Sequence, residues 1–225
     1  MNKQNNSSYE PKWGAEAILE EGKWFDLDVI RKIRIAKRYR IAQLDNELRN
    51  SRTIIESRLL IAAKKIGVST PYIYEIDLKK ATIVMENIDG DIVKDVLNSE
   101  ISDKNKIAII KEIGQLVGKL HSSEIIHGDL TTSNILLKND KITFIDFGLG
   151  KFSNAVEDHA VDILLIKKCF TSSHTSKNKE FFNAFQEGYK LTKDNAKMVL
   201  KRAVKVEARG RHLKEDQVKG DYLIS

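Results

Sequence analysis

Apolar and polar residues alternate with turn signals over the first third of the chain. The stretch Ala15–Ile35 contains apolar, β-leaning segments separated by turn residues, which predicts two or three strands. Two further apolar runs, Pro71–Ile76 and Ala81–Ile88, are joined by the polar sequence DLKK and predict a strand pair. Together these segments indicate a small antiparallel sheet.

A single helix interrupts the predicted strands. Between Gln43 and Lys65 the apolar residues recur close to helical spacing with charges between them, and the helix is expected to end near Gly67. The apolar residues of this helix are Leu48, Ile54, Ile55, Leu59, Leu60 and Ala63. Residues 1–11 are polar and are expected to form a flexible tail. Residues 12–88 are therefore predicted to form a β-rich first lobe with one helix.

The pattern becomes helical after Asp89. Helices are predicted over Asp91–Leu97 and over Lys104–His121, where Ser102 is the expected N-cap. Two short strands follow, at Ile135–Lys138 and Lys141–Ile145, joined by the turn dipeptide Asn139-Asp140.

The final part of the chain is also predicted to be helical. From Val161 to Glu207 it reads as helices separated by the polar loop TSSHTSKNK. Residues 89–225 are therefore predicted to form a mainly helical second lobe, and the fold class is α+β with two lobes.

Composition narrows the class of protein. Of the 225 residues, 41% are hydrophobic and 31% charged, which is typical of a globular protein. No long uncharged apolar run is present, so we expect no membrane segment and a soluble, cytoplasmic protein. The single cysteine, Cys169, excludes an internal disulfide framework and is expected to be a buried small hydrophobe. The net charge of +6 favours an anionic partner such as nucleic acid or a nucleotide.

The strongest chemical signal is the segment HGDLTTSNILLKNDKITFIDFGLG. In it Asp129 precedes Asn134 by five positions, and a predicted hairpin delivers Asp146 just before Phe147-Gly148. Any one of these residues alone would be read as a turn former, but their joint spacing across a hairpin favours a site. The segment resembles the catalytic segment of protein kinases. The resemblance implies that Asp129 orients or deprotonates the attacking hydroxyl, while Asn134 and Asp146 bind Mg²⁺ beside ATP.

That family also has a lysine on a first-lobe strand, paired with a helical glutamate, which holds the α- and β-phosphates. Lys32 fits this role. Its neighbour Arg31 competes by sequence, but strand alternation directs only one of them to the cleft. Glu56 lies in an apolar stretch of the predicted helix, where its carboxylate would face the sheet and meet Lys32. A solvated basic strand and an exposed helix glutamate are the respective alternatives.

The kinase resemblance places the adenine beneath the strand that ends in Met85, with backbone groups of Glu86 to Ile88 at its edge. An ordinary core strand is an equally good interpretation of this pattern. His127 resembles the first residue of the catalytic motif, where it holds the loop by packing and hydrogen bonding. The other histidines have no metal-ligand spacing, so no zinc site is predicted.

The chain departs from ordinary kinases in several places. No G-x-G-x-x-G precedes Lys32, Gly128 stands where arginine is usual, and Thr131 replaces a lysine that contacts the γ-phosphate. No A-P-E segment follows Asp146, so a docking platform for peptides is expected to be missing. Asp162 resembles the buried helix aspartate that braces the catalytic loop.

A closer resemblance rests on GAEA, RIAKRYR, the helix glutamate, HGDLTTSN, IDFGL, EDHAVD and the late RGR. These motifs resemble the small atypical kinase of the KEOPS complex over nearly the whole chain. The resemblance implies a minimal protein-kinase-like fold and a partnership with the threonylcarbamoyl-transferring subunit in tRNA modification. It further implies ATP hydrolysis or autophosphorylation more than broad serine/threonine protein phosphorylation.

Basic residues near the end of the chain suit an RNA partner. Lys201, Arg202, Arg209 and Arg211 could contact tRNA phosphates, although a solvated basic helix is the alternative. Three functions remain open from the sequence: an ATPase or kinase inside a tRNA-modifying assembly, a free-standing small-molecule phosphotransferase, and a catalytically idle tRNA-binding scaffold. The intact set of Asp129, Asn134 and Asp146 favours the first two.

Overall fold

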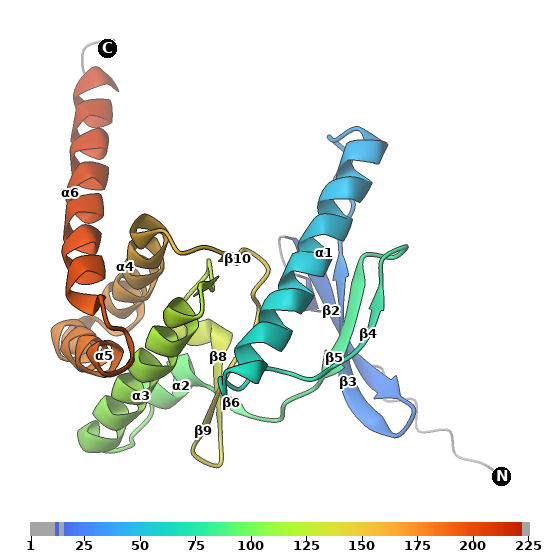
Figure 1. Ribbon diagram of the computed structural model, residues 1–225, viewed down its shortest axis with the longest axis horizontal. Helices are drawn as coiled ribbons and strands as arrows, with labels where there is room; N and C mark the ends of the chain where they lie inside the picture. Colours follow the sequence, from blue (N-terminus) through green and yellow to red (C-terminus); the bar gives the residue numbers. More distant parts are fainter. Residues whose placement is uncertain (1–11, 14–15, 222–225) are drawn as a thin grey trace.

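The computed structural model describes residues 12–13 and 16–221, with side chains described for residues 16–209. The predicted tail, residues 1–11, lies outside the described residues. A β-sheet with one helix forms one part of the molecule, and a group of helices forms the other (Figure 1). The predicted α+β fold with two lobes is confirmed. The division at residue 88 stays a prediction.

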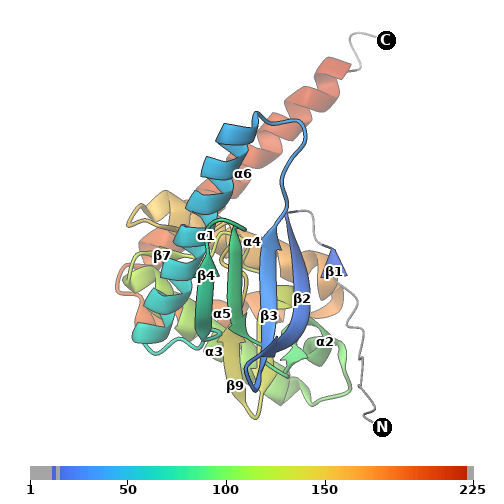
Figure 2. The ribbon, with the colours of Figure 1, turned by 90° about the vertical axis from the view of Figure 1, so that its right-hand side faces the viewer.

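The first lobe is built on a five-stranded antiparallel sheet. Its strands are β1 (Lys12–Trp13), β2 (Ala17–Trp24), β3 (Leu27–Arg34), β4 (Ile73–Asp77) and β5 (Thr82–Glu86), in the order β1-β2-β3-β5-β4. Helix α1 (Ala42–Lys65) lies across the sheet, and Figure 2 shows it running alongside β4 and β5. The predicted helix, Gln43–Lys65, therefore has nearly the observed bounds.

Strand alternation decides which basic side chains of β3 lie under α1. Lys32 pairs with Leu19 on one side and with Ile83 on the other, in the middle of the sheet. Lys32 and Arg34 are two residues apart, so they share a face, and both are almost fully buried. Arg31 faces the other way and donates to the carbonyl oxygen of Lys23 at 2.6 Å.

The second lobe combines helices with a two-stranded sheet and a three-stranded sheet. Its elements are β6 (Asp91–Ile92), α2 (Val93–Asn98), α3 (Asp103–Ser122), β7 (Ile125–Ile126), η1 (Thr132–Asn134), β8 (Ile135–Lys138), β9 (Lys141–Phe144), β10 (Lys151–Phe152), α4 (Val156–Ser173), η2 (Thr175–Lys177), α5 (Asn178–Thr192) and α6 (Ala196–Asp221). The three-stranded sheet has the order β6-β8-β9. Strand β10 pairs with β7, so the segment after Asp146 is hydrogen-bonded to the strand that leads into the segment carrying Asp129.

Local signals set two of these elements. The side chain of Ser102 accepts a hydrogen bond from the backbone N–H of Asn105, which is the predicted N-cap of α3. Asn139 and Asp140 both have positive φ, at 48° and 58°, as a tight two-residue turn between β8 and β9 requires. The predicted hairpin is confirmed.

The core of the second lobe depends on a close approach of α3 and α5. A Cβ added at Gly114 would lie 2.2 Å from the carbonyl oxygen of Phe185, and one at Gly188 only 1.8 Å from that of Lys111. Only glycine permits this backbone contact. Phe185 and Tyr189 on α5 are fully buried in the resulting interface.

Two predictions for the end of the chain are corrected. Helix α4 begins at Val156, five residues before the predicted start. The expected polar loop TSSHTSKNK is mostly helical, because its first residues end α4 and its middle forms η2. The reason is His174, which is buried and bonds inward to Asn98 Oδ1 at 2.9 Å. Among the described residues, no helix is both long and apolar enough to cross a bilayer.

Candidate active site

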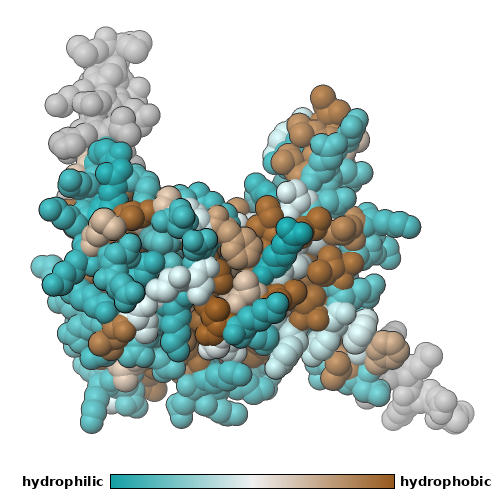
Figure 3. Space-filling model, viewed as in Figure 1, coloured by the Kyte–Doolittle hydropathy of each residue, from teal (hydrophilic) through white to brown (hydrophobic). Residues whose placement is uncertain are grey.

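A pocket between the two lobes collects most of the residues predicted to bind a nucleotide. It has about 750 Å³ of empty space. Its walls include Lys32, Glu56, Met85, Glu86, Ile88, Asn134 and Asp146. Apolar side chains of Leu19, Ile30 and Leu136 complete it, so a flat apolar base would find contacts from both lobes. Figure 3 shows hydrophobic surface running down the middle of the molecule, beside α1.

Lys32 stands at the centre of the charged part of this pocket. Its Nζ lies 2.7 Å from Glu56 Oε1 and 2.6 Å from Asp146 Oδ1. Glu56 is 1% exposed, whereas the side chain of Asp146 is 48% exposed and faces the pocket. The structure therefore brings the strand lysine, the helix glutamate and the hairpin aspartate together around one ammonium group.

Glu56 also holds a second cation that the sequence analysis missed. Arg34 Nη2 donates to Glu56 Oε2 at 2.6 Å, so each oxygen of one buried carboxylate has its own cation. The signal was present, because Arg34 follows Lys32 by two residues on a strand. Burial of a charge is tolerated only when it is paired, and Glu56 is paired twice.

Asp146 is suited to bind a hard cation. Burial raises the pKa of its carboxyl, but the charge and hydrogen bond of Lys32 outweigh burial and hold that pKa below its ordinary value. The backbone N–H of Gly148 donates to Asp146 Oδ1 at 3.1 Å. Asp146 also has a positive φ of 60°, a conformation that costs free energy in a residue with a Cβ.

Asn134 fixes the candidate base. Its Nδ2 donates to the carboxylate Oδ2 and to the carbonyl oxygen of Asp129, each at 2.8 Å. With the amide nitrogen engaged there, the side-chain oxygen of Asn134 is its remaining ligand atom. Asn134 and Asp146 line the same pocket and offer oxygen atoms, which fits Mg²⁺.

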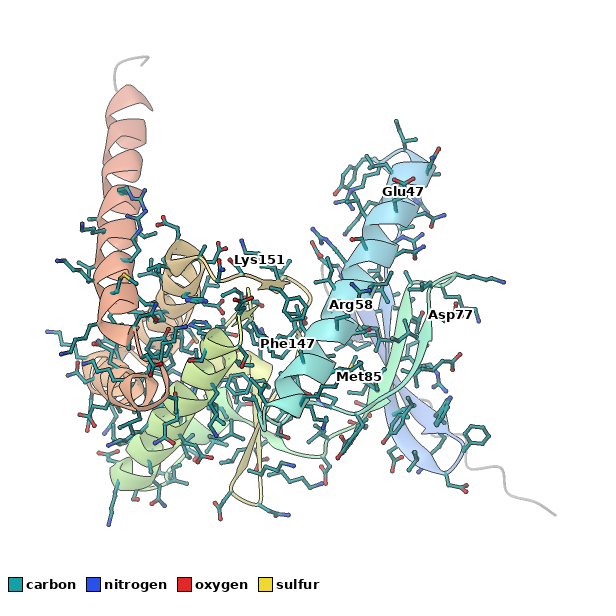
Figure 4. All side chains as sticks on the ribbon, in the orientation of Figure 1. Glu47, Arg58, Asp77, Met85, Phe147 and Lys151 are labelled. Carbon is teal, nitrogen blue, oxygen red and sulfur yellow. The ribbon has the colours of Figure 1, made fainter. Side chains whose placement is uncertain are left out.

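His127 links the two halves of the site. Its Nδ1 accepts from the backbone N–H of Asp129 at 3.3 Å, and its Nε2 donates to the carbonyl oxygen of Ile145 at 3.1 Å. Burial lowers the pKa of His127, so the neutral ring with the proton on Nε2 satisfies both contacts. The ring packs on Phe147, with 4.5 Å between centroids (Figure 4 labels Phe147). His127 therefore positions the residues next to both carboxylates.

Asp162 holds the catalytic loop from beneath. It is 1% exposed and accepts from the backbone N–H groups of His127 and Gly128, at 2.7 and 2.9 Å. His121 Nε2 lies 3.3 Å from the same carboxylate. Two backbone donors converging on one buried carboxylate fix the start of the loop that carries Asp129.

The predicted adenine edge needs a refinement. The N–H of Glu86 donates to the carbonyl oxygen of Tyr72 at 2.8 Å, and that of Asn87 to the carbonyl oxygen of Asp28 at 3.1 Å. Both amides are therefore engaged within the sheet. The carbonyl oxygen of Ile88 accepts from the N–H of Gly90 at 3.0 Å, so the N–H of Ile88 is the donor of this segment left to meet a base. Met85 on β5 forms the adjacent wall (Figure 4).

Comparison with known proteins places these residues in a family. Residues 15–185 match the lipopolysaccharide kinase (Kdo/WaaP) family. The KEOPS complex subunit Bud32 of Pyrococcus abyssi is 39% identical over 209 residues, which cover 89% of this chain and 94% of the relative. The chain belongs to the Bud32 family.

Other relatives of this Bud32-family chain are longer. A probable bifunctional tRNA threonylcarbamoyladenosine biosynthesis protein of Methanosphaera stadtmanae is 48% identical over 200 residues. The matched part covers 89% of this chain but 36% of that relative. A protein of the same description from Methanocaldococcus jannaschii is 42% identical, again over 36% of its length. The chain thus spans about a third of these two relatives.

Solved structures support the kinase-like fold of the Bud32-family chain. The Rio2 kinase–ADP/Mg²⁺–phosphoaspartate complex from Chaetomium thermophilum superposes with a TM-score of 0.60 at 19% identity, over 92% of this chain and 70% of that one. WaaP in complex with acyl carrier protein gives a TM-score of 0.63 at 14% identity, over 92% and 88%. At these identities the likeness concerns the fold alone.

The basic residues predicted to contact tRNA lie on α6 of this Bud32-family chain, and the end of α6 projects beyond α4 and α5 (Figure 1). Lys201 is exposed, whereas Arg202 and Arg209 both pair with Glu157 on α4. The hydrogen bond from Arg202 is the main reason why the pKa of Glu157 is lowered. Arg211 lies beyond the residues whose side chains are described. The contact with tRNA stays a prediction.

Proposed function

We propose that the chain is a Mg-ATP-dependent phosphotransferase with ATPase and serine/threonine kinase activity that supports threonylcarbamoyladenosine formation in tRNA as a KEOPS subunit. The observation that carries this proposal is the position of Lys32, whose ammonium joins Glu56 and Asp146 inside one pocket. Burying a lysine is costly unless it is paired, and these two carboxylates hold the Lys32 ammonium at the pocket wall. A nucleotide could place its phosphates between Lys32 and Asn134, beside the Lys32 ammonium. Its base would then lie against Met85.

The residues of the site divide the work. Lys32 binds the α- and β-phosphates, and Glu56 keeps its ammonium in place. Asp129, held by Asn134 Nδ2, orients a hydroxyl or water and accepts its proton. When bound by Asn134 and Asp146, Mg²⁺ would neutralise negative charge on the phosphates. Thr131 stands where kinases usually have a lysine that contacts the γ-phosphate. Because that contact is missing, we expect turnover to be slow.

The partner follows from the relatives. One of them is named a KEOPS complex subunit, and two are named bifunctional threonylcarbamoyladenosine biosynthesis proteins. We therefore expect the chain to act with the threonylcarbamoyl-transferring subunit and other KEOPS subunits. The tRNA would reach it through that assembly.

The test is magnesium-dependent ADP release by the purified chain and by Asp129→Asn, with and without tRNA and the threonylcarbamoyl-transferring subunit. The expected result is turnover that rises with the partners and is lost in Asp129→Asn. Partner-independent turnover with a small-molecule acceptor would instead identify a free-standing phosphotransferase. Equal ADP release by wild type and Asp129→Asn, or none in any mixture, would contradict the proposal.

A further inference from the structure

A second pocket lies where β3 leads into α1. We call it the junction pocket and define it by its lining residues, Glu16, Arg34, Ile35, Lys37, Arg40, Leu48, Arg49 and Arg52. It has about 270 Å³ of empty space and shares no lining residue with the nucleotide pocket. Of its lining residues, Arg34 alone takes part in the candidate site described above, through Glu56.

The junction pocket has an excess of positive charge. Five arginine and lysine side chains line it against one carboxylate, Glu16. Asp45 adds a second carboxylate, because it lies 2.8 Å from Arg49 Nε and 3.5 Å from Arg40 Nη1. The hydrogen bond from Arg52 to Glu16, with the charges of Arg52 and Arg34, lowers the pKa of Glu16. Glu56 adds a third carboxylate through its pair with Arg34, and five cations against three carboxylates still leave the pocket electropositive.

One of these cations has an unsatisfied donor. The side chain of Arg34 is 4% exposed, and its Nε has no hydrogen-bond partner among the described residues. Its Nη2 is held by Glu56, and its Nη1 lies 3.9 Å from Glu16, beyond hydrogen-bond distance. A buried donor without an acceptor costs about 1 to 3 kcal/mol, and more for a charged group. Because Arg34 lines the junction pocket, an acceptor bound there is the candidate partner for this donor.

We propose that the junction pocket binds a phosphate group. A phosphate carries more charge than a carboxylate and offers several acceptor oxygens, which suits converging arginine forks. The source could be the backbone of an RNA or a free phosphate-bearing molecule. The chemistry of recognition is the same for both, and the experiment separates them.

Glu56 connects the junction pocket to the nucleotide pocket. Its Oε2 accepts from Arg34 and its Oε1 from Lys32. A phosphate that attracts Arg34 weakens its hold on Glu56 and leaves that carboxylate to Lys32. Binding at the two pockets is therefore coupled, and the coupling is reciprocal. This coupling, unlike phosphate binding itself, rests on the proposed nucleotide site.

The first experiment titrates inorganic phosphate at constant ionic strength and follows the melting temperature of the full chain. The variants are Arg40→Gln in the junction pocket and Arg58→Gln, an exposed arginine on the same helix outside it (Figure 4). We expect saturable stabilisation of the wild type, an apparent affinity about tenfold weaker in Arg40→Gln because a charge-assisted contact is lost, and no change in Arg58→Gln. An unsaturable rise, or equal affinity in both variants, would overturn the proposal.

The second experiment identifies the source by measuring binding of unmodified tRNA to the same three proteins. A larger loss of tRNA affinity in Arg40→Gln than in Arg58→Gln supports an RNA phosphate. Equal tRNA affinity, together with weakened phosphate binding in Arg40→Gln, supports a free phosphate-bearing molecule. Mg-ADP affinity, measured with and without phosphate, then tests the coupling separately. If phosphate binds but does not change the affinity for Mg-ADP, the coupling is contradicted. The assignment of the junction pocket as a phosphate site would still stand.

Discussion

Gly128 lies directly against the carbonyl oxygen of Leu149. A Cβ at residue 128 would stand 2.1 Å from that oxygen, and Gly128 has a φ of +81°. Space and backbone conformation therefore both require glycine where other kinases carry arginine. The catalytic loop and the segment after Asp146 touch at this point.

The close contact predicts a large effect of Gly128→Ala. The new methyl group must displace the backbone of Leu149 and also occupies a left-handed conformation. We expect the free energy of unfolding to fall by about 3 kcal/mol or more, measured by urea denaturation. Gly67→Ala is the matched control, because Gly67 also has a positive φ but a Cβ there would meet nothing within 4 Å. It should cost about 1 kcal/mol, and equal losses in the two variants would contradict the role given to Leu149.

Glu56→Gln should destabilise the fold as well as the site. Without the carboxylate, Arg34 and Lys32 lose their shared counter-charge, and Arg34 is left buried with Glu16 at a distance. Removing one partner of a buried ion pair costs about 3 to 5 kcal/mol. Glu47→Gln, an exposed change on the same helix (Figure 4), should stay within about 0.5 kcal/mol in the same denaturation assay. A Glu56→Gln protein as stable as Glu47→Gln would exclude a buried charge cluster.

Asp129→Asn and Asp146→Asn should separate chemistry from binding. Asp129 does not line the nucleotide pocket but bonds to Asn134, so its amide variant should bind Mg-ADP normally and lose turnover by about 10² to 10⁴. Asp146→Asn removes a negative charge from the pocket and should weaken magnesium-dependent ADP binding itself. Calorimetry and ADP release measure the two quantities. Normal turnover in both variants would refute the site.

His159 should make stability depend on pH. Burial lowers the pKa of His159 to about 4, and the charges of His121 and Lys193 act in the same direction. The unfolded state, with an ordinary pKa near 6.5, takes up the proton first as pH falls. The contribution of His159 is therefore complete above about pH 6.5 and is lost toward pH 4.

His159→Asn cannot titrate and tests this directly. The melting temperature of the wild type should fall more between pH 7 and pH 5 than that of the variant. His127 and His174, which burial also shifts to lower pKa, are present in both proteins, so they cancel in the comparison. Parallel melting curves across this range would show that His159 is not the responsible group.

The sequence predicted the fold best where a local rule decides the backbone. Ser102 caps α3 and Asn139-Asp140 turns the hairpin because each needs only its immediate neighbours. The loop TSSHTSKNK was predicted wrongly because its composition is polar, whereas His174 is buried by residues distant in the sequence. The polarity of the segment does not reveal that Asn98, far away in the sequence, is the hydrogen-bond partner of His174.

In the candidate site, too, local sequence rules predicted some residues, whereas contacts made by distant elements could not be predicted. Strand alternation predicted that only one of Arg31 and Lys32 faces the cleft, and the kinase resemblance favoured Lys32. An isolated glutamate among apolar helix residues indicated Glu56. The pairing of Arg202 and Arg209 with Glu157 could not be predicted, because these residues are brought together only when α4 and α6 pack. The pairing of Arg34 with Glu56 could have been predicted, because Arg34 lies two residues after Lys32 on β3 and so shares its face.

The ladder between β10 and β7 makes two parts of the site one cooperative unit. Lys151 pairs with Ile126 just before the catalytic loop, and a Cβ at Gly150 would lie 2.6 Å from the carbonyl oxygen of Ile126. Amides on both strands should therefore exchange with solvent at similar rates, as members of one local unfolding event. Evolution therefore constrains the two segments together, because a substitution that destabilises one strand also destabilises the strand paired with it.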